Sequence, residues 1–112
     1  LPIFYFDYLY IKDLVKIVEY FINHKPKFSS YNLGRGKGIS LLTIARTVMK
    51  LLNIKKPITI KKPGLNKQYT CDTSRLRSTI KGLQYTDLKT SLRQLTAYYE
   101  SILPTIGKNA FI

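Results

Sequence analysis

The residue types that carry most covalent and metal chemistry are scarce in this chain. It has one cysteine, one histidine and six Asp and Glu residues, and it has no tryptophan. The single Cys71 excludes an internal disulfide and suits a reducing compartment. So few Cys, His and carboxylate side chains provide no ligand set for a metal site. We therefore expect no metal cofactor.

Long apolar runs are also missing. No apolar stretch reaches the length of a membrane span, and Asp7 and Lys12 interrupt the apolar start of the chain. The sequence has no succession of basic, apolar and small-residue segments typical of a signal peptide. We expect a cytoplasmic protein with no membrane partner. Because the sequence begins at Leu1 inside an apolar run, we also expect it to be a piece of a longer chain.

Acidic residues are few beside the basic ones, and this imbalance limits the choice of partner. The 19 Lys and Arg against 6 Asp and Glu give a formal net charge of +13. Such a charge attracts polyanions, phosphorylated metabolites or acidic membrane surfaces, but it does not specify a fold. A hydrophobic content of 45% favours a packed domain over a disordered chain. The length of 112 residues suits one small domain.

The most informative stretch is YNLGRGKGISLLTIARTVMKLL, residues 31–52. It predicts a short strand, a tight glycine turn and an amphipathic helix. In the segment 34–38, three glycines alternate with Arg35 and Lys37, so the turn combines backbone freedom with two cations. Ser40 stands at the expected N-cap position. One face of the helix then carries Leu41, Ile44, Ala45, Val48 and Leu52.

The glycine turn has the backbone donors and the positive charge to hold an anion, but its sequence pattern favours a turn with a purely structural role. A dinucleotide fingerprint, G-x-G-x-x-G, needs a glycine at position 39, which is isoleucine. The acidic residue expected further along is missing, since residues 58–60 are Ile-Thr-Ile. A tight strand-to-helix turn is therefore the favoured interpretation. Arg35 and Lys37 keep a phosphate-binding alternative open.

Further short elements are predicted around this stretch. Residues 5–11 favour a strand, and Asp13 is expected to cap a helix that runs to Asn23. Short strands are expected at 57–60 and 67–71. The buried stripe expected for the first helix consists of Leu14, Val15, Val18, Phe21 and Ile22.

Two more helices are predicted towards the C-terminus. Asp72 or Thr73 is expected to cap the first of them, and Gly82 to end it. Thr86 or Asp87 is expected to cap the last helix. The stripe expected for that helix consists of Leu88, Leu92, Leu95, Tyr99 and Ile102.

Together these patterns predict an α+β fold, a small domain of about four helices and a few short strands. Pro104 is expected to end the last helix. The domain then covers residues 1–103 and is followed by a C-terminal tail, residues 104–112.

Three segments carry motifs of a known family. FDYLYIKDLVKIVEYFI, residues 6–22, is similar to an R-D-F-I-Y-V-D-D strand and its following helix. YNLGRGKGISLLTIARTV, residues 31–48, is similar to a Y-N-L-G-x-G-x-x-x-S turn and helix. Residues 71–100 are similar to a D-x-S-K-x-x-x-x-L-G-x-x-P block and closing helix. In this order the segments resemble the C-terminal part of extended short-chain dehydrogenase/reductases, the NAD-dependent epimerases and dehydratases of nucleotide sugars.

The resemblance implies a substrate-binding segment without its catalytic half. In the family, an N-terminal Rossmann domain carries the NAD or NADP cofactor, the active-site Ser or Thr and a Tyr-x-x-x-Lys pair. It implies that this chain has no catalytic or cofactor-binding residues and is inactive alone. Its partners would be the missing Rossmann domain and, in the intact enzyme, a nucleotide-sugar substrate. Tyr8–Lys12 and Tyr85–Lys89 match Tyr-x-x-x-Lys, but the chain is so rich in both residue types that we assign neither pair a role.

The resemblance also indicates which residues would contact the substrate. The family's pyrophosphate-binding Arg is replaced by Phe6, and its R-x-G-D word corresponds to Lys-Pro-Gly-Leu at 62–65. Lys62 still offers a point charge, whereas Leu65 cannot hydrogen-bond a ribose. The expected substrate-binding residues are Lys62 first, Lys61 and Arg35 behind it, and Tyr69 as a stacking or hydroxyl group.

A second class of function and an oligomeric state also follow from the sequence. The cluster of Lys55, Lys56, Lys61, Lys62 and Lys67 suits a small basic binding module for RNA or another polyanion. Binding of nucleic acid is the less favoured of the two functions, because the sequence contains no recognised nucleic-acid-binding module. Residues 1–11 are apolar and would lack their cover without a Rossmann domain, so we expect a homodimer through this strand.

Overall fold

The computed structural model describes the backbone of residues 5–59 and 69–106 and the side chains of 5–59 and 69–103. The elements are β1 (Tyr5–Phe6), α1 (Ile11–Asn23), β2 (Ile39–Ser40), α2 (Leu41–Leu51), α3 (Ser74–Thr79) and α4 (Leu88–Ile106). The expected α+β class with four helices is confirmed. The strands pair antiparallel, with Tyr5 opposite Ser40 and Phe6 opposite Ile39. A single parallel bridge joins Phe6 to Tyr69.

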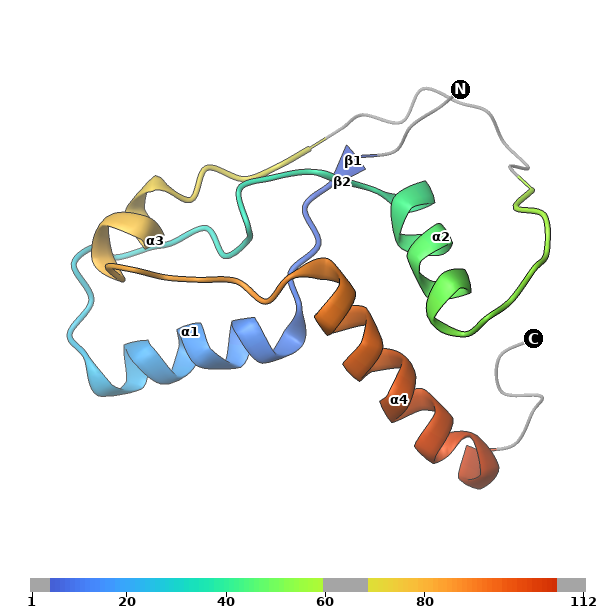
Figure 1. Ribbon diagram of the computed structural model, residues 1–112. Helices are drawn as coiled ribbons and strands as arrows, with labels where there is room; N and C mark the ends of the chain where they lie inside the picture. Colours follow the sequence, from blue (N-terminus) through green and yellow to red (C-terminus); the bar gives the residue numbers. More distant parts are fainter. Residues whose placement is uncertain (1–4, 60–68, 107–112) are drawn as a thin grey trace.

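The two strands lie between two helical parts of an open molecule. Figure 1 shows α1 and α3 on one side of the small sheet, and α2 and α4 on the other. The accessible surface is 8883 Å², whereas a compact protein of 13.0 kDa exposes about 6,300 Å². The radius of gyration is 17.0 Å, against about 13 Å for a compact chain of this length. The molecule is therefore more open than a compact domain of this size.

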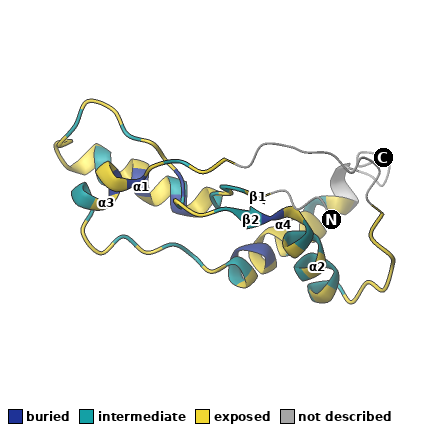
Figure 2. Ribbon diagram, turned by 90° about the horizontal axis from the view of Figure 1, so that it is seen from above, coloured by how far each residue is buried: buried dark blue, intermediate teal, exposed yellow. Residues whose placement is uncertain are grey.

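Few apolar side chains are buried in the described part of the chain. Ile17, Leu76 and Leu92 are 1%, 0% and 8% exposed, and each comes from a different helix. In Figure 2 the buried positions form only short segments along the ribbon. In the same part of the chain, buried polar residues are at least as numerous as these apolar ones: Asp13, Ser40, Thr73 and Ser91 are each 7% exposed or less.

Helix α1 differs from its prediction at both its start and its buried face. It begins at Ile11 with Tyr10 as N-cap, so the expected strand 5–11 is reduced to Tyr5–Phe6. Asp13 does not cap the helix but lies buried within its first turn, 3% exposed. Because the helix turns Asp13 and Ile17 inwards, the predicted stripe was wrong for Val15, Val18 and Ile22, which are exposed.

The glycine segment also forms a different local structure from the one predicted. The strand follows the glycines, as Ile39–Ser40, and residues 31–33 form none. Ser40 is the N-cap residue of α2, as expected, although its side chain makes no capping hydrogen bond. Residues 57–59 lie outside any strand.

The C-terminus of α2 is closed by a left-handed residue. Asn53 has φ of 53°, and the N–H groups of Asn53 and Ile54 donate to the carbonyls of Lys50 and Met49. This is the hydrogen-bond pattern of a Schellman motif, which satisfies two of the last carbonyls of the helix. It also turns the following segment back alongside α2.

The starts of α3 and α4 follow local signals. Thr73 is the N-cap residue of α3, and the Asp72 carboxylate accepts the Ser74 N–H at 2.9 Å. The Asp87 carboxylate accepts the Thr90 N–H at 3.0 Å, so the predicted cap of α4 is confirmed. The predicted end at Pro104 is wrong, because α4 continues through this proline to Ile106.

Candidate functional site

The carboxylate of Asp7 occupies the donors of the glycine turn. Its two oxygens accept the N–H groups of Arg35 at 2.8 Å and of Gly36 at 2.9 Å. Gly36 has φ of +78°, which suits glycine and aims consecutive N–H groups at one acceptor. The Asp7 carboxylate therefore already occupies the donors of the turn, which favours a structural turn over the phosphate-binding alternative. For the same reason, the turn does not fit the pyrophosphate of NAD or NADP.

Gly34 and Cys71 complete the packing around this carboxylate. A Cβ atom on Gly34 would meet the Cys71 Sγ and would lie 2.8 Å from the Asp7 Oδ2. The Cys71 thiol donates to the same oxygen at 3.6 Å. Burial raises the pKa of the Cys71 thiol, and the negative charge of Asp7 raises it further. Cys71 is therefore a protonated donor at neutral pH rather than a nucleophile.

Tyr85 joins the loop before α4 to the same turn. Its hydroxyl donates to the Gly34 carbonyl at 2.7 Å, so this member of a Tyr-x-x-x-Lys match has a structural partner. The guanidinium carbons of Arg35 and Arg77 lie 5.9 and 5.4 Å from the Tyr85 ring centre. Arg77 also donates to the Arg35 carbonyl at 2.9 Å. Burial raises the pKa of the Tyr85 hydroxyl, against the opposing charge of Arg77.

A buried carboxylate, Asp13, connects α1 to the same loop. Asp13 accepts the Thr86 hydroxyl at 2.7 Å and the Thr86 N–H at 3.0 Å. Charge-assisted hydrogen bonds of this kind are about twice as strong as neutral ones. We call the groups around Asp7, which come from residues 7, 34–36, 71 and 85, the Asp7 junction. The hydrogen bonds between Asp13 and Thr86 are separate from this junction, although Thr86 directly follows Tyr85 in the sequence.

The sequence-predicted substrate residues lie in different surroundings. Lys61 and Lys62 are outside the described residues. The Arg35 side chain packs against Tyr85, and its Nε is buried without a hydrogen-bond partner among the described residues. Tyr69 is 64% exposed, and its ring centre lies 5.1 Å from that of Phe6. Of the two described residues, Tyr69 is thus the one presented to solvent.

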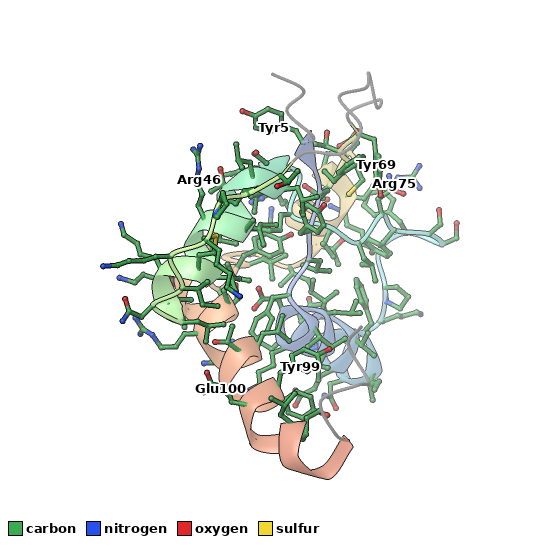
Figure 3. The ribbon with its side chains drawn as sticks, turned by 90° about the vertical axis from the view of Figure 1, so that its right-hand side faces the viewer. Tyr5, Arg46, Tyr69, Arg75, Tyr99 and Glu100 are labelled. Carbon is green, nitrogen blue, oxygen red and sulfur yellow. The ribbon has the colours of Figure 1, made fainter. Side chains whose placement is uncertain are left out.

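Tyr69 lies at the part of the molecule that holds the two strands. Figure 3 shows Tyr69 and Tyr5 at the β1 end, and Arg46 projecting from α2. Tyr69 contacts Phe6, and the backbone of Arg35 donates to the next residue, Asp7. The structure therefore attaches both predicted residues to the same short segment, although their side chains lie against different partners.

An open groove of about 1350 Å³ lies between α2, the segment after it and the start of α4. We call it the α2–α4 groove. Its apolar lining consists of Leu42, Met49, Leu51, Ile54, Ile58 and Leu88. Its basic lining consists of Arg46, Lys50, Lys56, Lys89 and Arg93. No carboxylate lines the groove among the residues that the structure describes.

The basic residues of the groove escaped the sequence analysis because they come from separate elements. Only Lys56 belonged to a cluster visible along the chain. The available signal was a repeated spacing of four, Arg46 with Lys50 and Lys89 with Arg93, which places each pair on one helix face. The Schellman motif at Asn53 then brings Lys56 beside the first pair.

Within residues 5–59 and 69–106, no three His, Cys, Asp or Glu side chains gather closely enough to hold a metal ion. Helices of the described chain are too short or too polar to cross a membrane. Comparisons with protein-family models, curated proteins and solved structures found no match for this chain.

Proposed function

We propose that this chain is the C-terminal substrate-binding segment of an NAD(P)-dependent nucleotide-sugar epimerase or dehydratase. One observation carries the proposal: the three segments that resemble the family all meet at the Asp7 junction. Asp7 comes from the first segment, the Arg35 and Gly36 donors from the second, and Cys71 and Tyr85 from the third. Motifs that are far apart in sequence thus serve one structural purpose, as expected of a shared fold.

The open shape supports a role beside another domain. The surface exceeds that of a compact protein by about 2,500 Å², from 8883 Å² observed and about 6,300 Å² expected. A standard interface buries about 800 Å² on each partner, so the open surface is more than enough for one domain interface. The Rossmann domain of the intact enzyme is the proposed partner, and it would bring the cofactor that the glycine turn does not fit.

The substrate would lie on the side of Tyr69, with Lys62 and Lys61 as its cations. An exposed Tyr ring beside Phe6 offers an apolar face for a base or a sugar and a hydroxyl for hydrogen bonding. Arg35 holds its place against Tyr85 and contributes positive charge from behind the turn. In this proposal the chain binds and orients the anionic substrate, and the oxidation step belongs to the other domain.

NMR titrations of the chain with UDP-glucose and, separately, with NAD test the proposal. We expect chemical-shift changes around Tyr69 with the sugar nucleotide, and none saturating with NAD. Tyr69→Ala should weaken the sugar-nucleotide response, while Tyr98→Ala, another exposed tyrosine at 57%, should leave it unchanged. Stoichiometric NAD binding, or an equal response in both variants, would contradict the proposal.

A small basic module for RNA or another polyanion is the second candidate, and the α2–α4 groove favours it. Five cations without a lining carboxylate attract phosphate groups, although the described lining contains no aromatic ring to stack a base. Anisotropy titrations of a labelled RNA oligonucleotide at 50 and 200 mM salt separate the candidates. Tight binding that falls steeply with salt and depends on Arg46 and Arg93 would support the module.

A further inference from the structure

Helix α1 exposes an apolar seam along its length. Ile11, Val15, Val18 and Ile22 are 58%, 57%, 45% and 77% exposed. Their spacings of four, three and four residues place them on one helix face, and we call them the α1 seam. This spacing is that of the a and d positions of a coiled coil, with d at Ile11 and Val18. Figure 1 shows α1 along an edge of the molecule, with α3 on one side of it.

The residue types of the α1 seam are arranged symmetrically about its centre. Ile11 and Ile22 lie equally far from a midpoint between residues 16 and 17, and so do Val15 and Val18. A two-fold axis through this midpoint makes the α1 helices of two copies antiparallel. Each isoleucine then lies opposite the other isoleucine of the second copy, and each valine opposite the other valine. A self-complementary surface of this kind is what an isologous dimer requires.

The charged residues beside the seam also favour the antiparallel orientation. Lys12 and Glu19 are exposed and occupy the two e positions on one flank. In an antiparallel pair, Lys12 of each copy faces Glu19 of the second copy, which gives two complementary contacts. A parallel pair would instead place these residues against the g positions, Leu14 and Phe21, which pack towards the chain's own interior.

We propose that a second copy of this chain occupies the α1 seam as an antiparallel helix pair. This interface lies on α1, whereas the dimer expected from the sequence used the first strand, and it is independent of the proposed substrate site. The helix has 13 residues and spans about 20 Å, so the seam alone buries less than a standard interface of about 1,600 Å². The dimer is therefore weak. Like charges of +13 oppose it, and salt strengthens it by screening them.

Sedimentation velocity of the purified chain, up to about millimolar concentration at 50 and 300 mM salt, tests the proposal. We expect a monomer–dimer equilibrium whose dimer fraction rises with salt. Val18→Asp should lower the association constant at least about tenfold, since it removes a valine that the dimer would bury and leaves a charge in the seam. It also lowers the net charge by one, so general repulsion cannot explain the loss. Ala97→Asp, an exposed residue of α4, makes the same charge change and should have no effect.

A charge exchange tests the orientation without altering the apolar residues. Lys12→Glu and Glu19→Lys each place like charges opposite one another, and each should weaken association about two- to tenfold. The double variant restores opposite charges and should regain the original constant within about twofold. All these side chains are exposed, and circular dichroism confirms that the helices persist. A monomer at both salts, a dimer insensitive to Val18→Asp, or a double variant as weak as the singles would each overturn the proposal.

Discussion

Converting two carboxylates into amides separates the roles of Asp7 and Asp13. Asparagine keeps the size of the side chain but replaces one acceptor oxygen with an NH₂ donor. Asp7 receives two backbone N–H groups, at 2.8 and 2.9 Å, and neither can become an acceptor. Asp13 receives one N–H at 3.0 Å and one hydroxyl at 2.7 Å, and a hydroxyl can reverse its role.

The expected costs follow from these donors. Asp7→Asn directs an NH₂ group at an N–H group, so one charge-assisted bond is lost and one donor is left unpaired. We expect the free energy of unfolding to fall by about 2–4 kcal/mol, moderated by the solvent access of the Gly36 bond. In Asp13→Asn the Thr86 hydroxyl turns to accept from the new NH₂ group, so both contacts persist as neutral bonds. We expect a loss of about 1 kcal/mol.

Urea unfolding followed by circular dichroism at 222 nm measures both values by linear extrapolation. Glu100→Gln, at an exposed position, removes the same negative charge and provides the baseline for the general effect of charge. Small domains have about 5–15 kcal/mol of stability, so the Asp7 variant should lose a large share of it. If Asp13→Asn costs as much as Asp7→Asn after this correction, the reasoning from donor type is wrong.

Three further predictions concern single residues. Gly34→Ala should destabilise the chain strongly, because the Cβ meets sulfur and carboxylate atoms, whereas Gly82→Ala, at φ of +73° in open space, should cost only about 1–2 kcal/mol in urea unfolding. Cys71 should react slowly with iodoacetamide at pH 8 and faster above pH 9, because the pKa of its thiol lies above the ordinary value of 9.0. Removing the charge of Asp7 should speed the reaction at pH 8. If Cys71 of the folded chain reacts as fast as it does in the urea-unfolded chain, its pKa is not raised. Asn53→Gly should raise the free energy of unfolding by up to about 1 kcal/mol, since φ is 53°, and a loss would show that the Asn side chain contributes more than its backbone costs.

The features that the sequence predicted correctly depend on neighbouring residues. The Asp87 cap needs only Thr90, three residues later, and the presence of the last helix follows from its own apolar period. The predicted stripe of that helix was wrong for Leu95 and Tyr99, which are 39% and 45% exposed. The glycine turn before α2 was also recognised from its own residues. What it binds was not, because the bound carboxylate, Asp7, lies 28 residues before Arg35.

The buried face of α1 shows the same limit. Its apolar residues cover more than one face, so periodicity alone did not decide which face is inside. The inward face of α1 is the one that carries Asp13, whose hydrogen-bond partner Thr86 lies 73 residues later in the sequence. The α2–α4 groove was missed for a similar reason, because its cations come from two helices and the segment after α2, which only the fold brings together. Local signals thus predicted elements, and distant polar contacts determined how they are oriented.

The Asp7 junction also has a consequence for the kinetics of the chain. It can assemble only when residues separated by 28 to 64 positions have closed their loops, so it forms after the local turns of the helices. Interactions that are absent from the folding transition state change the unfolding rate and leave the folding rate nearly constant. We expect the junction to be absent from the folding transition state, so that its loss raises the unfolding rate and leaves the folding rate nearly constant.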